Sequence, residues 1–364
     1  MKQKDNIENK SALNVMEAVD KPPSINDTAV KKHLKNTAGA LTVNDYYQGI
    51  INGDRTLLSR AITLVESSKL EHHKLAQELI SLCLPHSGNS VRIGVTGVPG
   101  AGKSTFIEAF GKHVTSLGNK VAVLAIDPSS TRSKGSILGD KTRMEELSTD
   151  KNAFIRPSPS AGSLGGVARK TRETIILCEA AGYNYIFVET VGVGQNEITV
   201  HSMVDFFLLL LISGAGDELQ GIKRGVMEMA DAVLINKADG DNINRVNIAV
   251  AEIRNALHYF PPTFSGWQPQ CMPCSAITKK GIPEAFEMIN DYVEFTKKNK
   301  YFYQKRAEQA KQTMIDVINN NLFDHFYNIE SVKNKIKEVE TQLLKGELSP
   351  YIAAQQVLDI YFKK

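Results

Sequence analysis

Several features that define whole classes of protein are scarce in this sequence of 364 residues. The longest apolar run, Phe206–Ile212, is far too short to span a bilayer. The stretch Met1–Asp20 has no apolar core and no arginine, so we expect neither a secretory signal nor a transit peptide there. The formal net charge of +3 is close to balance, and basic residues do not cluster with aromatic ones. We therefore expect a soluble, cytoplasmic protein that binds neither nucleic acid nor a membrane.

Cysteine is also rare, with four residues in the chain. Cys271 and Cys274 form a lone C-x-x-C, whereas a zinc site needs a second cysteine pair or a histidine pair. Cys83 and Cys178 are isolated within apolar helical patterns. We predict four reduced thiols that pack as small hydrophobic side chains in a reducing compartment.

A glycine-rich stretch of the form G-x-x-x-x-G-K-S stands between an apolar, β-branched run, Val91–Thr96, and a run with helical spacing, Thr105–Phe110. Strand, glycine loop and helix in this order predict a phosphate-binding loop. Its backbone N–H groups and the helix N-terminus attract an anion. Lys103 can reach the β- and γ-phosphates, and the Ser104 hydroxyl can bind Mg²⁺. The predicted phosphate-binding residues are Gly97, Val98, Pro99, Gly100, Ala101, Gly102, Lys103, Ser104 and Thr105.

Two aspartates are candidate Mg²⁺ ligands. A second strand, Lys120–Ile126, ends in Asp127, and ligands of open α/β sheets gather at the carboxyl ends of strands. An aspartate that caps a turn is the alternative for Asp127. Asp140 lies in the charged, glycine-containing loop Thr131–Thr142, which we expect to move.

A further strand, Tyr185–Val188, is followed by Glu189 and, three positions on, by Gly192. Nucleotide hydrolases sense the γ-phosphate through a glycine N–H in this layout. Small G proteins have Asp where this chain has Glu189, so we expect the longer carboxylate to act on a metal-bound or attacking water. The predicted catalytic residues are Lys103, Glu189 and Asp140. Gln195 and Arg143 are further candidates for water activation, although the offset of Gln195 from Gly192 does not match the small G-protein glutamine.

The apolar run Phe206–Ile212 predicts a buried strand, and the segment Ser213–Gly225 after it combines glycines with opposite charges. This composition favours a switch over a solvated connection. The predicted switch residues of the chain are Gly192, Gln195, Asp217, Gln220 and Lys223.

The strand Ala232–Ile235 ends in the base-reading tetrapeptide N-K-x-D of GTP-binding proteins. In such a site the carboxylate of Asp239 accepts two hydrogen bonds from guanine, which adenine cannot offer. Lys237 covers the ring and Asn236 braces the loop, while the segment Ser275-Ala276-Ile277 offers a backbone N–H to guanine O6. Since adenine would leave a buried carboxylate unpaired, the nucleotide is predicted to be GTP.

These patterns predict an α/β fold: a P-loop NTPase G domain with a mostly parallel sheet, helices on both faces, and helical extensions at both ends. We expect a mobile tail at residues 1–40, a helical extension at 41–88, the GTPase domain at 89–299 and a helical dimerisation segment at 300–364. Two apolar stripes in the last segment must be buried, on the G domain or in a subunit interface, and we favour the interface. Their members are Val332, Ile336, Val339 and Leu343, then Ala353, Val357, Ile360 and Tyr361.

With these motifs, the chain from about Val43 onwards resembles the MeaB/ArgK/MMAA family of GTPases. The resemblance is carried by the stretches 97–104, 127–130, 135–144, 189–195, 214–223 and 236–239. It implies a GTP-hydrolysing chaperone, dependent on Mg²⁺, that gates adenosylcobalamin delivery to methylmalonyl-CoA mutase or a related mutase and protects that enzyme. It also implies homodimerisation through the C-terminal helices, a third switch at 214–223, and the mutase, with its adenosyltransferase, as partner.

Two other functions stay open. Part of this family has been labelled a transport-system kinase, which would require an acceptor pocket and would prefer ATP, against the guanine signals at Asn236–Asp239. A metal-insertion GTPase of the hydrogenase-maturation type would require Cys- or His-rich ligands near the N-terminus, and the sequence has none there.

Overall fold

A computed structural model describes residues 41–67, 69–126, 144–156, 164–190, 196–214 and 224–362 of the chain. Contacts divide the chain into two units, Met1–Thr42 and Val43–Lys364, and the second unit carries all the elements below. The predictions for Asp127, Asp140, Arg143, Gly192, Gln195, Asp217, Gln220 and Lys223 lie outside the described residues.

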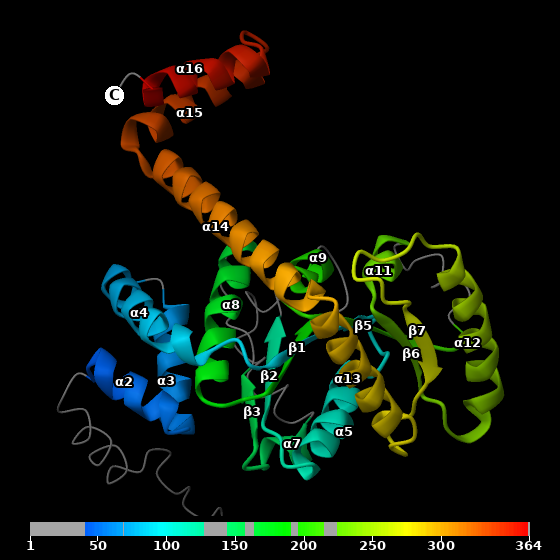
Figure 1. Cartoon of the computed structure of the whole chain (residues 1–364). Coiled ribbons are helices and arrows are strands. Elements are labelled where there is room, and N and C mark those ends of the chain that lie inside the picture. The colour runs from blue at the N-terminus through cyan, green and yellow to red at the C-terminus, as the bar shows by residue number, and fades with distance from the viewer. Residues whose placement is uncertain are drawn as a thin grey trace, which may run out of the picture. The chain divides into compact units, whose positions relative to one another are not determined.

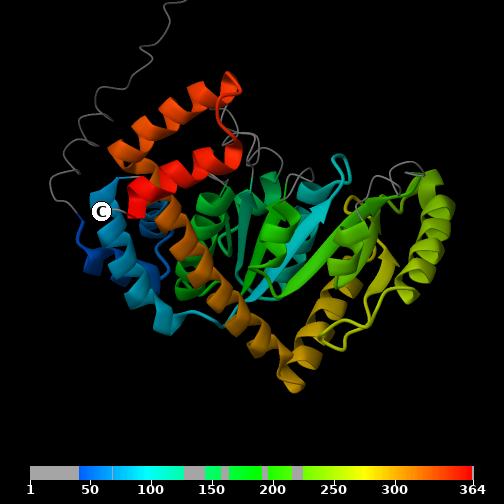
Figure 2. The same ribbon diagram turned by 90° about the horizontal axis from the view of Figure 1, so that it is seen from above.

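Seven parallel strands form one sheet in the order β3-β2-β4-β1-β5-β6-β7. Side chains of both orientations are buried along most strands, as expected for a parallel sheet with helices on both faces (Figures 1 and 2). The fold class predicted from the sequence is confirmed. The strands are β1 (Val91–Gly97), β2 (Val121–Ile126), β3 (Ala153–Arg156), β4 (Tyr185–Thr190), β5 (Phe206–Ile212), β6 (Ala232–Asn236) and β7 (Gln270–Pro273).

One face of the sheet packs against three helices, α5 (Lys103–Ser116), α7 (Glu145–Ser148) and α13 (Ile282–Lys298). Their apolar residues share one core with alternate residues of the strands, for example Ile93 and Val95 of β1. Phe302, in the first turn of α14 (Tyr301–Asn328), also belongs to this core.

The other face packs against helices from several parts of the chain. The N-terminal helices α2 (Val43–Ile51), α3 (Arg55–Glu66) and α4 (Leu70–Cys83) share a core with α8 (Leu164–Ala180) and α9 (Asn196–His201). Asp54 caps α3 by accepting from the backbone N–H groups of Thr56 at 2.7 Å and Leu57 at 3.0 Å, which satisfies two donors of its first turn. Over β5–β7 the same face carries α11 (Arg224–Met229) and α12 (Ile243–His258).

The C-terminal helices α15 (Glu330–Leu344) and α16 (Pro350–Phe362) form a hairpin with a small core of its own. Val332 and Val339 of α15 are buried against Ala353 and Val357 of α16. The two stripes therefore cover each other in part, since Val332, Val339, Ala353 and Val357 are buried whereas Ile336, Leu343, Ile360 and Tyr361 stay half-buried. The expectation that residues 300–364 form a subunit interface stays a prediction.

No helix within the described ranges is long and apolar enough to cross a membrane. All four cysteines are buried free thiols, as predicted. Burial raises the pKa of Cys83 to about 11 and those of Cys271 and Cys274 to about 12, so these thiols stay protonated at neutral pH.

Candidate nucleotide-binding site

The phosphate loop leaves the sheet at the carboxyl end of β1, which lies between β4 and β5. The strand order reverses at this point, and open α/β sheets bind ligands in the crevice that results. Gly97 has φ of +146°, and a Cβ atom there would lie 2.0 Å from the carbonyl oxygen of Leu210. Only glycine lets the chain turn away so close to β5.

Asn236, at the end of β6, joins three segments that the sequence assigns to the nucleotide. Its Nδ2 donates to the carbonyl oxygen of Ala101 in the phosphate loop at 2.8 Å. Its Oδ1 accepts from the backbone N–H of Ala276 at 3.2 Å. The side chain is buried, and Gly102 makes room for it, since a Cβ there would lie 2.8 Å from Nδ2. The phosphate loop and both base-reading loops are therefore held in one arrangement.

Lys103, the first residue of α5, is buried under the phosphate loop. Its Nζ donates to the carbonyl oxygens of Gly97 at 2.8 Å and Val98 at 3.2 Å. Burial lowers the pKa of Lys103, while the negative charges of Glu189 and Glu197 act in the opposite direction. The ammonium group thus lies inside the loop, at the place where a phosphate would be bound.

Ser104, in the first turn of α5, lies beside Glu189, near the carboxyl end of β4. The Ser104 hydroxyl donates to Oε1 of Glu189 at 2.8 Å. Next to them, Thr190 donates to Thr96 at 2.9 Å and links β4 to β1. Hydroxyl and carboxylate oxygens are the hard ligands that Mg²⁺ prefers, so the two residues fit the predicted metal.

The predicted base-reading loops are in direct contact. The Ser275 hydroxyl donates to Oδ2 of Asp239, and it accepts from the backbone N–H of Thr278 at 3.1 Å. The backbone N–H of Ala238 donates to the carbonyl oxygen of Cys274 at 2.9 Å. These bonds orient the carboxylate that would recognise guanine.

Other predicted residues lie on the surface of this site. Lys237 is exposed and has φ of +62°, an uncommon conformation for a residue with a Cβ atom. Pro99, Gly100, Thr105 and Ile277 are also exposed. Exposure at these positions suits residues that line a pocket open to a ligand from solvent.

Sequence reasoning missed two participants near the phosphate loop. One is the Thr96–Thr190 bond between strand ends. The other is Glu197 of α9, a buried carboxylate whose charge acts on Lys103. Glu197 could have been suspected from the sequence, because it is a charged residue shortly after the predicted switch residue Gln195. The sequence does not show, however, whether such a side chain is buried or exposed to solvent.

The family model described as "Methylmalonyl Co-A mutase-associated GTPase MeaB" matches residues 58–331. The chain belongs to the MeaB family. The resemblance identified from the motifs is confirmed, and the chain is a MeaB-family GTPase.

Similar proteins from distant organisms agree with this membership of the MeaB family. The Escherichia coli K12 protein "GTPase ArgK" is 46% identical over 325 residues, covering 86% of this chain and 98% of the relative. The mouse protein "Methylmalonic aciduria type A homolog, mitochondrial" is 45% identical over 329 residues, with 88% and 79% covered. A crystal structure described as that of an "LAO/AO transport system kinase" has a TM-score of 0.71 and 36% identity, covering 89% of this chain and 99% of that one.

Proposed function

We propose that this MeaB-family GTPase binds and hydrolyses GTP in order to gate adenosylcobalamin delivery to methylmalonyl-CoA mutase, or a related mutase, and to protect that enzyme. The observation that carries the nucleotide assignment is the Asn236 side chain, which joins the phosphate loop to the base-reading loops. The family description, which names a mutase-associated GTPase, supports the choice of partner.

In the proposed complex, Asp239 accepts from the two donors of guanine. Ser275 already holds one oxygen of this carboxylate, which keeps it oriented before the base arrives. Lys237 lies along the ring, and the Ser275–Ile277 loop supplies a backbone N–H to the O6 atom. With adenine the Asp239 carboxylate would lose both donors, which opposes ATP binding.

At the other end of the pocket, the loop N–H groups and Lys103 hold the phosphates. Ser104 would hold Mg²⁺, with Glu189, Asp127 and Asp140 reaching the ion directly or through its water, and the ion would neutralise charge that develops on the phosphates. Glu189 is the residue that we expect to orient a water molecule. Such catalysis depends on positioning and charge, so a slow intrinsic rate that a partner accelerates is expected.

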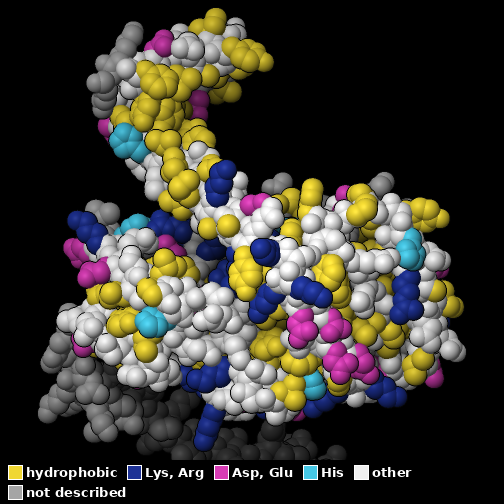
Figure 3. Space-filling view, viewed as in Figure 1, with side chains coloured by type: hydrophobic (Ala, Val, Ile, Leu, Met, Phe, Trp, Pro, Cys, Tyr) yellow, Lys and Arg dark blue, Asp and Glu magenta, His cyan; other side chains and the backbone are white. Residues whose placement is uncertain are grey.

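We further propose that the chain forms a homodimer through α14. This helix exposes a row of large apolar side chains in its second half (Figure 3). A contiguous exposed apolar surface of this kind is typical of a protein interface. Its members are Met314, Ile315, Ile318, Leu322, Phe323 and Tyr327.

The experiment that tests the main proposal is a binding assay with purified mutase. Capture is measured with GDP and with a non-hydrolysable GTP analogue, and the mutase-stimulated GTPase rate is measured in parallel. We expect affinity for the mutase to differ between the two nucleotide states, and mutase to raise the hydrolysis rate. Equal affinity in both states together with unstimulated hydrolysis would contradict the proposal. The same assay with the adenosyltransferase tests the second partner.

A kinase is the second candidate, because the similar crystal structure is described as that of a transport-system kinase. The two functions differ in where the γ-phosphate goes. With γ-labelled GTP, the label is expected in inorganic phosphate. Label in an amino acid or a protein acceptor would support the kinase instead.

A further inference from the structure

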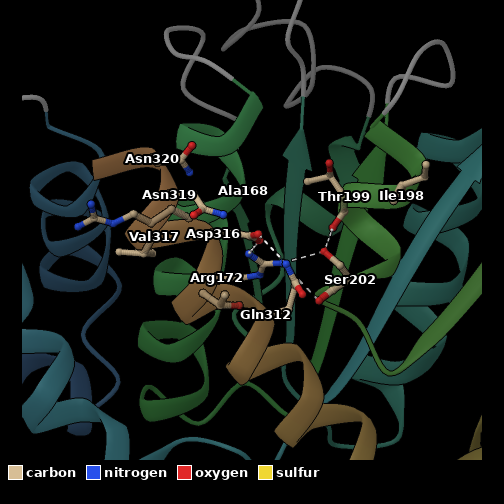
Figure 4. Close-up of a pocket in the computed structure, with 12 residues that line it drawn as sticks. Ala168, Arg172, Ile198, Thr199, Ser202, Gln312, Asp316, Val317, Asn319 and Asn320 are labelled. Atoms are coloured by element: carbon tan, nitrogen blue, oxygen red, sulfur yellow. Dashed lines mark hydrogen bonds and ion pairs between the residues drawn. The ribbon is translucent and has the colours of Figure 1, made fainter. Parts of the chain in front are cut away.

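Arg172 lies where α8, α9 and α14 meet, next to a cavity of about 470 Å³ (Figure 4). The cavity is lined by all three helices, including Ile198 and Ser202 on the α9 side and Gln312 and Asp316 on α14. The cavity opens to solvent, since Ile198, Asn319 and Asn320 in its lining are exposed, and it leaves room for α9 and this part of α14 to shift relative to one another.

The guanidinium group of Arg172 connects these helices but is only partly paired. Its Nη2 donates to the Ser202 hydroxyl at 2.7 Å, and its Nη1 lies 3.7 Å from Oδ2 of Asp316 (Figure 4). Its Nε is buried and has no hydrogen-bond partner among the described residues. Gln312 donates to the other oxygen of Asp316 at 2.9 Å. A small approach of α14 would convert the loose ion pair into a two-point pair, the stronger geometry for arginine and carboxylate.

Helix α9 is in close contact with the strand that carries the phosphate loop. A Cβ atom on Gly94 of β1 would lie 2.9 Å from Cγ1 of Val200 in α9. Because Gly94 has no side chain, α9 can pack closely against β1. The same helix begins at Asn196, shortly after β4 ends at Thr190 beside Glu189. Glu197, in the first turn of α9, is buried and its charge acts on Lys103 of the phosphate loop, so a change of charge at the phosphates is felt by α9.

Helix α14, in contrast, is fixed at its start. The Nε and Nη2 atoms of Arg306 donate to the two carboxylate oxygens of Asp205 at 2.7 Å each, and Lys305 donates to the Asp205 carbonyl at 2.8 Å. Asp316 lies ten residues beyond Arg306, about 15 Å along the helix. A shift at Asp316 would therefore turn α14 about its anchored first turns.

We propose that Arg172 is a latch that couples α9 to α14, so that the nucleotide state of the pocket sets the position of α14 and of the α15–α16 hairpin attached to it. Two arrangements alternate: a loose one, with Ser202 bound and Asp316 at a distance, and an engaged one, with Asp316 paired at two points. The inference rests on the proposed GTP site. It specifies how that site communicates with the C-terminal helices.

The test is hydrogen–deuterium exchange of the full chain, with GDP and with a non-hydrolysable GTP analogue, in the absence of mutase. Peptides that cover residues 310–322 are compared between the two states. In the wild type we expect their exchange rates to differ by about fivefold or more, a typical size for coupling between sites. The ratio of the exchange rates in the two states should fall below about twofold in two variants. Asp316→Asn keeps the shape of the side chain but removes its charge, and Arg172→Lys removes the planar guanidinium group.

Asp324→Asn is the matched control, because Asp324 is an exposed acid on the same helix. It should keep the wild-type ratio, the wild-type nucleotide affinity and the wild-type basal hydrolysis, whereas the two latch variants should change the relative affinity for the two nucleotides by no more than the coupling they remove, about fivefold. A wild-type ratio preserved in Asp316→Asn, or no nucleotide dependence in the wild type, would overturn the latch. Neither result would bear on the mutase assay, whereas failure of nucleotide-dependent mutase binding would leave this exchange measurement unaffected.

Discussion

Arg306 and Asp205 form a two-point pair at the amino end of the sheet, far along the strands from the nucleotide site. The Asp205 side chain is 2% exposed and also accepts from the backbone N–H of Arg92 at 2.8 Å. Arg306 in turn donates to the carbonyl oxygen of Ser90 at 2.7 Å. A residue of the predicted C-terminal segment thus completes the hydrogen bonding of the β1 and β5 strand starts.

Arg306→Ala should lower the free energy of unfolding by about 3–5 kcal/mol, because it leaves the buried Asp205 carboxylate without its main partner. Urea denaturation followed by circular dichroism measures the loss. Arg245→Ala, at an exposed arginine of α12, is the control and should stay within about 0.5 kcal/mol of the wild type. A loss below about 1 kcal/mol for Arg306→Ala would show that water replaces the pair.

Asp239→Asn should raise the dissociation constant for GTP by about 10- to 100-fold, the loss expected when charged hydrogen bonds to guanine are removed. Calorimetry with GTP and ATP measures both affinities. The exposed Asp241 provides the control, Asp241→Asn, which should leave both unchanged. An unchanged preference for guanine in Asp239→Asn would contradict the base assignment.

Lys103→Ala should reduce the hydrolysis rate at saturating GTP by about 10²–10³-fold, because a positive charge beside the transferred phosphoryl group is lost. Single-turnover assays separate this effect from binding. Lys151→Ala, at an exposed lysine, should hydrolyse GTP at the wild-type rate. Turnover of Lys103→Ala within about threefold of the wild type would remove Lys103 from the catalytic set.

His201 gives the fold a specific sensitivity to acid. Burial, with a smaller contribution from the positive charge of Lys305, lowers the pKa of His201 to about 4, whereas the unfolded chain should titrate near 6.5. Between pH 4 and pH 6.5, His201 binds a proton in the unfolded chain but not in the folded chain, so a fall in pH favours unfolding. The contribution of neutral His201 to the free energy of unfolding is therefore complete above pH 6.5 and is lost as the pH falls towards 4.

Between about pH 7 and pH 4.5 the wild type should therefore lose about 2–3 kcal/mol more stability than His201→Gln, which does not titrate. Urea denaturation at the two pH values measures the difference. His258→Gln, at an exposed histidine, should lose stability in parallel with the wild type. Equal losses in the wild type and His201→Gln would mean that His201 accepts a proton within the folded state.

Strands and helices could be predicted from the sequence where a local pattern of apolar residues determines a single element of secondary structure. The apolar runs at Val91–Thr96 and Phe206–Ile212 predict β1 and β5 because a buried parallel strand needs apolar side chains on both faces. The short β3, Ala153–Arg156, was missed, since four residues give too little periodicity to separate a strand from a loop.

Contacts between distant residues could not be predicted in this way. Asn236 was expected to brace its own loop, but nothing in the sequence indicates that it binds Ala101. Arg172 and Asp316 each occur in an ordinary helical pattern, and only the folded chain brings them together. That the two C-terminal stripes pack partly on each other could not be predicted either, because periodicity shows which face of a helix is apolar and not what covers it.

The Arg306–Asp205 pair also constrains how the protein is made. Its two residues are separated by 101 positions, so at usual translation speeds Asp205 leaves the ribosome roughly 5–20 s before Arg306. Throughout that interval the Asp205 carboxylate of the nascent sheet has no Arg306 to pair with, because Arg306 has not yet been synthesised. The GTPase region therefore cannot reach its final stability during translation until the first turns of α14 have emerged.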